Sequence, residues 1–145
     1  SMIASACGVS VDLATPWLTV EPRPTFDVVA SFSERYRALD WRGLAPWGRL
    51  GFVGLETEYR CFCAAYGLTN IEHVKTANLL EAAQVIAGAR LILCNQTCAL
   101  ALASALGKEV LCEVCDYCPN VAIMRGQGCV SQAQLDRALR AGGVG

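Results

Sequence analysis

Short apolar blocks and longer amphipathic blocks alternate along the chain. The short blocks have the length of buried strands, and the longer ones repeat apolar residues at the helical spacing of three and four. The predicted strands are Phe26–Ala30, Leu50–Gly54, Ile71–Val74, Leu91–Cys94, Glu109–Glu113 and Val121–Met124, and the predicted helices cover 59–66, 78–88, 98–106 and 131–140. This alternation predicts an α/β fold: a Rossmann-like, doubly wound and mostly parallel sheet of about five or six strands with helices on both faces. We expect Leu91–Cys94 to be central, between Phe26–Ala30 and Glu109–Glu113.

The clearest unit is the strand–helix–strand stretch from Arg90 to Glu113. Polar residues 95–97 interrupt the apolar pattern where the helix should begin. The Ala- and Leu-rich segment that follows predicts a helix that is apolar all round and therefore buried, and Gly107 ends it. Ligands of open parallel sheets bind at such strand-to-helix turns, so the polar residues here are the first candidates for a site.

Two segments depart from the regular alternation. Residues 115–120 are too few for a helical crossover, so Val121–Met124 is expected to be a small edge strand whose direction the sequence leaves open. Residues 1–24 contain several prolines and predict an extended arm, the remnant of a preceding domain, in front of a domain at 25–145. The arm is too apolar to lie in water as one patch, so it either folds back over its own sheet or packs on a second copy.

Composition narrows the class of protein. The chain has 145 residues, of which 54% are hydrophobic and 17% charged, with a net charge of −1. These values fit one domain with a substantial core, and they argue against a nucleic-acid or anionic-membrane surface. No apolar run approaches the length of a membrane span, and we expect no signal peptide from the pattern. Nine cysteines in no regular framework favour a reducing compartment, and we expect a cytoplasmic protein.

Candidate ligand-binding residues lie at the ends of predicted strands. Asn95, Gln96 and Thr97 lie where a helix N-terminus could bind phosphate, although Asn95 or Thr97 could equally cap a buried helix. Glu113 ends the next strand, where a partly exposed carboxylate could bind ribose hydroxyls or remain a solvated charge. The chain contains neither a dinucleotide-binding glycine motif nor a P-loop.

Two arginines follow the first predicted strand. Arg35 and Arg37 leave it toward the same edge of the sheet and could clamp a diphosphate, because guanidinium groups bind phosphate bidentately. The alternative is a pair of ordinary surface arginines in a polar loop.

Three cysteines have a spacing that also occurs in metal sites. Cys112, Cys115 and Cys118 are separated by two residues each, but neither a fourth cysteine at a suitable distance nor a neighbouring histidine follows them. Cysteine also behaves as a small apolar residue in cores. We therefore expect no metal and no cofactor, and His73 has no partner for a catalytic triad.

Several stretches together resemble the C-terminal, donor-binding half of GT-B glycosyltransferases, in particular the heptosyltransferase-like proteins of bacteria and phages. The stretches are 33–37 with Trp41, 52–59, 78–83, 94–97, 103–107, Glu113 and 119–120. The resemblance runs from about Pro16 to the end of the chain. It departs from the family pattern at Cys94, where the family usually has glycine, and at Thr97, where it usually has serine.

The resemblance implies a nucleotide-sugar-binding domain. Asn95, Gln96 and Thr97 would face the donor phosphates or sugar, Glu113 the ribose, and Arg35 and Arg37 the diphosphate. The family's acceptor site and catalytic base belong to an N-terminal half that this sequence lacks, so no catalytic residue is assigned and no sugar transfer is expected from this chain alone. The partners expected are a nucleoside diphosphate sugar, and a second copy or a missing transferase domain. The alternative is a non-enzymatic interaction or oligomerisation domain that keeps the fold without binding a donor.

Overall fold

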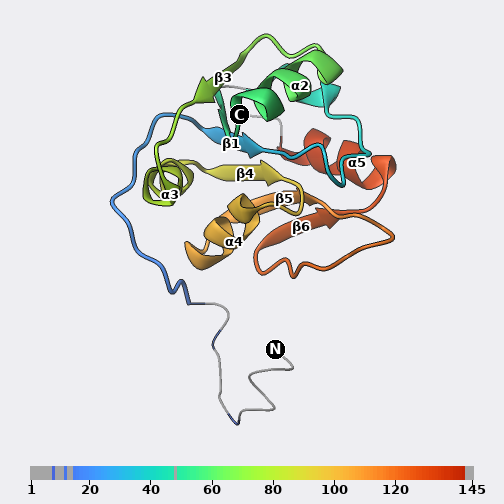
Figure 1. Cartoon of the computed structure of the whole chain (residues 1–145). Helices are drawn as coiled ribbons and strands as arrows, with labels where there is room; N and C mark the ends of the chain where they lie inside the picture. The colour runs from blue at the N-terminus through green and yellow to red at the C-terminus, as the bar shows by residue number, and fades with distance from the viewer. Residues whose placement is uncertain (1–7, 9–11, 13–14, 48, 143–145) are drawn as a thin grey trace.

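The computed structural model describes residues 8, 12, 15–47 and 49–142, and within them the strands form one parallel sheet (Figure 1). The strands are β1 (Val28–Ser31), β2 (Leu50–Val53), β3 (Ile71–Val74), β4 (Leu91–Cys94), β5 (Glu109–Glu113) and β6 (Gly126–Cys129). Their order is β3-β2-β1-β4-β5-β6, and each neighbouring pair is parallel. The predicted central position of β4, between β1 and β5, is confirmed.

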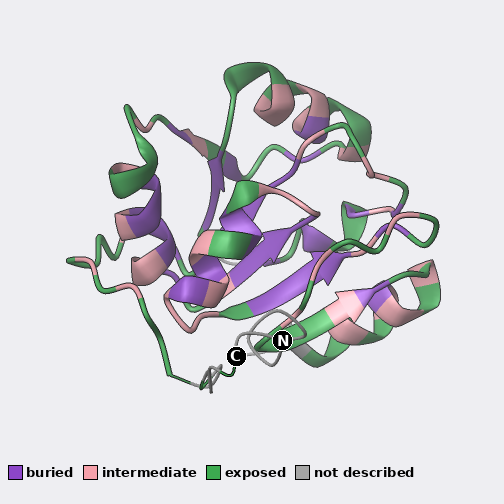
Figure 2. Cartoon of the chain, turned by 60° about the horizontal axis from the view of Figure 1, so that its bottom comes forward, coloured by how far each residue is buried: buried purple, intermediate pink, exposed green. Residues whose placement is uncertain are grey.

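Helices cover both faces of this sheet. The helical segments are η1 (Arg42–Leu44), α2 (Glu56–Tyr66), α3 (Leu79–Gly88), α4 (Cys98–Ala105) and α5 (Gln132–Gly142). One apolar cluster joins η1, α2 and α5 to the sheet, and the other joins α3 and α4 to the opposite face. Figure 2 shows the buried sheet between these two layers. The fold is therefore the predicted Rossmann-like, doubly wound α/β arrangement.

The strands supply both clusters by simple alternation. In β1, Val28 and Ala30 face the α2 and α5 side, whereas Val29 faces α3 and α4. In β4, Leu93 and Ile92 divide in the same way. Successive side chains of a strand point to opposite faces, so an apolar run without polar interruptions is what a sheet covered on both sides requires.

In its described residues, the connection from β1 to β2 contains η1 but no α-helix. The sequence predicted a polar connection here, but its aromatic residues are buried. Trp41 is fully buried and contacts Phe32 edge-on with ring centroids 4.7 Å apart, and Phe32 stacks on Phe62 of α2 at 4.6 Å. Trp47 joins the same cluster. This loop thus covers part of the sheet face where a crossover helix would otherwise lie.

The prediction for the last strand is wrong in position. The strand is β6 at Gly126–Cys129, parallel to β5, and Val121–Met124 is not a strand. Gly126 has φ +98° and lies so close to the backbone of Val110 that a Cβ atom would collide with it. Only glycine can adopt this φ and approach the neighbouring backbone so closely. The sequence-based prediction instead followed the apolar run Val121–Met124. Val121 and Ile123 instead pack against the cluster under α3 and α4.

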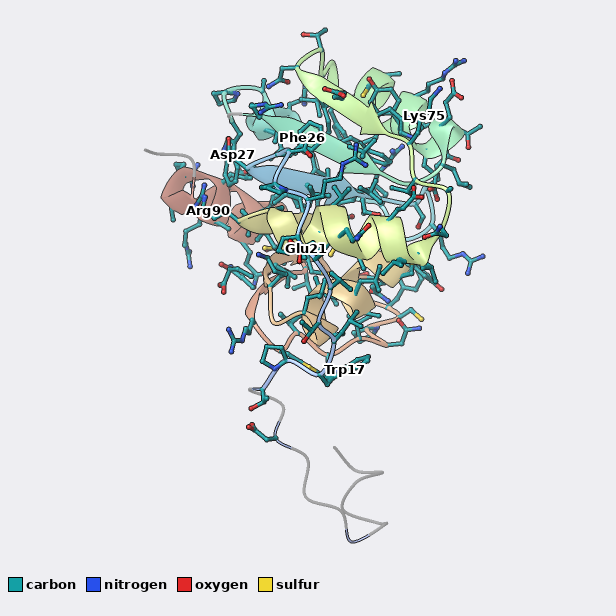
Figure 3. The ribbon with its side chains drawn as sticks, turned by 90° about the vertical axis from the view of Figure 1, so that its left-hand side faces the viewer. Trp17, Glu21, Phe26, Asp27, Lys75 and Arg90 are labelled. Carbon is teal, nitrogen blue, oxygen red and sulfur yellow. The ribbon has the colours of Figure 1, made fainter. Side chains whose placement is uncertain are left out.

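The described part of the arm lies on the domain. Figure 3 shows the extended segment running from Trp17 past Glu21 to Phe26. The amides of Trp17 and Leu18 both donate to the carbonyl of Ala105 at the end of α4, each over 3.0 Å. This part of the arm therefore folds back onto its own helices. The apolar residues Ile3, Val9, Val11 and Leu13 lie outside the described residues.

The predicted all-round burial of α4 is only partly correct. Ala99, Leu100, Ala103 and Ala105 are buried, whereas Cys98 at its first turn is exposed. The helix packs against one face of the sheet, so the side that points away from the sheet is exposed to solvent although its residues are small and apolar. This exposed first turn borders the candidate site.

Candidate functional site

A crevice of about 950 Å³ opens at the carboxyl edge of the sheet. It lies across the ends of β1, β2 and β4, at the point where the strand order reverses between β1 and β4. Open α/β sheets bind their ligands at this place because the flanking loops diverge there. The strand ends contribute Ser31, Val53, Gly54, Gln96 and Thr97, and the first turns of α2, α3 and α4 complete the walls.

The N-terminus of α4 is open toward this crevice. Thr97 occupies the N-cap position, but its side chain makes no capping hydrogen bond. Its hydroxyl oxygen is buried and has no hydrogen-bond partner, and the amides of Cys98 and Ala99 donate to no other described residue. The first amides of a helix and its partial positive charge together favour a bound anion. An unpaired buried hydroxyl beside them is costly unless a ligand engages it.

The other two helix N-termini at the crevice differ from α4 because each has a carboxylate of the chain itself in its first turn. In α3, the Asn78 side chain accepts the amide of Glu81 over 3.0 Å, and the Glu81 carboxylate accepts the amide of Ala77 over 2.8 Å. At α2, the Glu58 carboxylate accepts the amide of Leu55 over 3.0 Å. Both carboxylates also neutralise the positive ends of their helices. Of the three helix starts that line the crevice, only α3 has a side-chain cap from its N-cap residue, and only α4 has no carboxylate in its first turn.

The predicted ligand Asn95 is buried and its hydrogen bonds are internal. Its Oδ1 accepts the amide of Ser33 over 3.2 Å, and its Nδ2 donates to the carbonyls of Ser33 and Arg35, each over 2.9 Å. The side chain is 0% exposed and does not line the crevice. Asn95 thus fixes the backbone that carries Arg35, which makes it a positioning residue in this structure.

Gln96 joins the crevice to the loop between β5 and β6. Its Oε1 accepts the amide of Cys115 over 2.7 Å, and its Nε2 donates to the carbonyl of Cys118 over 2.9 Å and to the side chain of Asn120. Gln96 also lines the crevice beside Thr97. The successive side-chain amides of Asn95 and Gln96 therefore hold the β1–β2 loop and the β5–β6 loop, respectively.

Glu113 differs most from its prediction. A partly exposed carboxylate was expected, but this side chain is 1% exposed. Its Oε1 accepts the amide of Leu39 over 2.9 Å and that of Ala38, and its Oε2 accepts the indole N–H of Trp41 over 2.9 Å. The carboxylate therefore anchors the β1–β2 loop to β5. The sequence could not indicate this, since its partners lie more than 70 residues away.

The two predicted arginines are on different sides of that loop. Arg35 lines the crevice together with Gln96 and Thr97. Arg37 lies over the ring of Tyr66, with its guanidinium carbon 5.5 Å from the ring centroid, and lines a second cavity of about 280 Å³ together with Glu113. Three of the six predicted residues therefore share the crevice, two share the second cavity, and the buried Asn95 lines neither.

The crevice also contains residues that the sequence did not single out. Glu34, Glu58, Cys61 and Cys98 line it. A hydrogen bond with Glu34 is the largest cause that raises the pKa of the Cys61 thiol, so this thiol remains protonated at neutral pH. A signal for Glu58 was present, because it lies shortly after the end of a predicted strand, where acidic residues of doubly wound folds contact ligands.

The described residues contain no group of three or more His, Cys, Asp or Glu side chains that could hold a metal ion. Cys112 is buried in β5 opposite Cys94 of β4. A hydrogen bond with Cys112, together with burial, raises the pKa of the Cys94 thiol well above its usual value. His73, the one histidine of the sequence, stacks on Tyr59 at 5.0 Å between ring centroids, and its Nε2 lies 3.0 Å from the carbonyl oxygen of Gly54.

Comparison with protein-family models, with curated proteins and with solved structures finds no match to this chain. In the described part of the chain, none of the helices has the length and apolar character needed to cross a membrane.

Proposed function

We propose that the crevice binds a nucleoside diphosphate, such as a nucleotide sugar, with a phosphate group at the N-terminus of α4. The observation that carries this proposal is the unpaired, buried hydroxyl of Thr97 next to two amides without acceptors. Phosphate oxygens accept hydrogen bonds from both kinds of donor, and the helix dipole adds a favourable interaction with the negative charge.

Arg35 supplies the second element of the proposed phosphate site. It is exposed, lines the crevice, and forms no ion pair with another described residue, although it lies near the Tyr36 ring. A free guanidinium on a backbone that Asn95 holds in place can bind a phosphate bidentately. The proposal keeps Thr97, Gln96 and Arg35 as ligand contacts and gives Asn95 the positioning role.

The fold fits the donor-binding half of a GT-B glycosyltransferase, which supports the nucleotide-sugar class. Sugar transfer is not part of the proposal, because the acceptor site and catalytic base of the family that the sequence resembles belong to its N-terminal half. Glu113 is not proposed to contact the ribose, because its carboxylate already accepts three hydrogen bonds from the chain itself.

Calorimetric titration with the diphosphates of uridine, guanosine, cytidine and adenosine, and with their sugar conjugates, tests the proposal. We expect at least one to bind, and Arg35→Ala to weaken it by roughly 1.5–3 kcal/mol, as loss of hydrogen bonds to a charged group does. Arg37→Ala is the matched control, because Arg37 lies on the other cavity and should leave the affinity unchanged. Absence of binding by every compound, or equal effects of the two substitutions, would contradict the phosphate assignment.

A second candidate function is protein association at the same edge. Leu55, Leu79 and Leu80 are more than half exposed at the starts of α2 and α3. Exposed leucines near a crevice are also typical of interaction surfaces. Light scattering that shows a dimer, combined with a failure of all the nucleotides to bind, would favour this alternative.

A further inference from the structure

The crevice is much larger than a phosphate and changes in character along its length. Between α3 and α4 its walls are apolar, formed by Ala82 and Ile86 of α3 and by Ala99 and Leu102 of α4. Leu79 forms an exposed part of the wall, with 64% of its surface accessible. Sites for small organic molecules combine such apolar walls with a few polar groups that fix orientation.

The charges on the crevice restrict where a phosphate can lie. Glu34 and Glu58 line it, and Glu58 also accepts the amide of Leu55 at the start of α2. Carboxylates repel phosphate but accept hydrogen bonds from hydroxyl groups. A ligand with an anionic end at α4 therefore needs an uncharged remainder, with hydroxyl groups opposite these carboxylates and an apolar part between α3 and α4.

We infer that the groove between α3 and α4 is a nucleobase subsite, so that the ligand lies with its phosphate at Thr97 and its base against Leu79, Ala82 and Leu102. This inference rests on the proposed function and assigns the base to the opposite side of the switch point from Glu113. The base provides the flat apolar surface that the groove can cover, and the ribose provides hydroxyls for Glu34 or Glu58. A hydrocarbon chain would match the groove but would offer no hydroxyl groups to those carboxylates.

The inference is tested by comparing three probes: adenosine diphosphate, inorganic pyrophosphate and geranyl diphosphate. Adenosine diphosphate should bind at least about tenfold more tightly than pyrophosphate, since base contact buries apolar surface. The substitution Leu79→Ala should weaken adenosine diphosphate about fivefold and leave pyrophosphate unchanged. Leu80→Ala is the matched control, because Leu80 is 59% exposed but does not line the crevice, and it should affect neither probe.

The outcomes separate the two proposals. If neither pyrophosphate nor adenosine diphosphate binds, the proposed function fails and the subsite fails with it. If both bind with equal affinity, or if Leu79→Ala leaves adenosine diphosphate unaffected, the phosphate site stands and the base subsite is wrong. Tighter binding of geranyl diphosphate than of adenosine diphosphate would assign the groove to a hydrocarbon chain and also overturn the inference. Circular dichroism of each variant checks that the fold is retained.

Discussion

Glu113 ends β5 and Thr97 follows β4, its neighbour in the sheet, yet one side chain is fully hydrogen-bonded within the chain and the other is not. The Glu113 carboxylate accepts three hydrogen bonds from the β1–β2 loop, whereas the buried Thr97 hydroxyl has no partner. Both residues lie at the carboxyl edge, where ligands of this type of fold bind. The difference shows that a polar side chain at this edge is available to a ligand only where the chain has not already used it.

The starts of α3 and α4 repeat this contrast on one face of the sheet. Each helix is preceded by an N-cap residue of a type that commonly caps helices, Asn78 before α3 and Thr97 before α4. Asn78 caps its helix and Glu81 completes the closure, but α4 has no equivalent of either bond. One helix start is therefore complete within the chain, and the other has free donors.

The largest expected effect is the loss of the Glu113 carboxylate. Glu113→Ala leaves the buried amide of Leu39 and the indole N–H of Trp41 without acceptors. We expect the free energy of unfolding to fall by about 3 kcal/mol, at about 1–3 kcal/mol for each unpaired donor. Urea denaturation followed by tryptophan fluorescence measures it. Glu109→Ala, at an exposed position of the same strand, should cost less than about 0.5 kcal/mol. A Glu113→Ala variant as stable as the control would mean that the carboxylate does not anchor the loop.

A smaller effect distinguishes the two helix starts. Asn78→Ala should lower the free energy of unfolding by about 1 kcal/mol, the usual cost of losing a side-chain cap. Thr97→Val should leave it unchanged or raise it, because the substitution removes a buried hydroxyl that has no partner. Thermal and urea unfolding of the two variants without ligand provide the comparison. Equal destabilisation by both would show that the Thr97 hydroxyl is bonded within the chain.

The sequence predicted the architecture more completely than the site. Alternating apolar blocks were sufficient for the parallel sheet and for the central place of β4, because burial on both faces dictates that pattern. The last strand was predicted in the wrong place because β6, with Gly126 and Gly128, has almost no apolar pattern. Val121–Met124 has a stronger apolar pattern but forms no strand. Local pattern contains no information about the close approach of Gly126 to β5.

The sequence predicted which region contains the site, but it did not predict the role of each residue there. Asn95 and Glu113 were predicted as ligands because they are polar residues at strand ends. Their hydrogen bonds, however, join segments about 60 and 70 residues apart, and only the folded chain brings these together. Thr97 was assigned to the correct turn, but its unpaired hydroxyl could not be foreseen, since the same residue in the same position usually caps its helix.

Substitution of Thr97 by aspartate tests most directly whether the open start of α4 binds an anion. The new carboxylate would cap α4 as Asn78 caps α3, and it would place a negative charge where the phosphate is proposed to lie. Titration calorimetry with adenosine diphosphate should then show at least about a tenfold loss of affinity, or about 1.4 kcal/mol, while the protein unfolds at the same temperature as the unmodified chain or higher. Ser131→Asp, before the first turn of α5 and outside the crevice, makes the same charge change and should leave the affinity unaltered. Undiminished binding of adenosine diphosphate by the folded Thr97→Asp variant would contradict the claim that the start of α4 is the anion site.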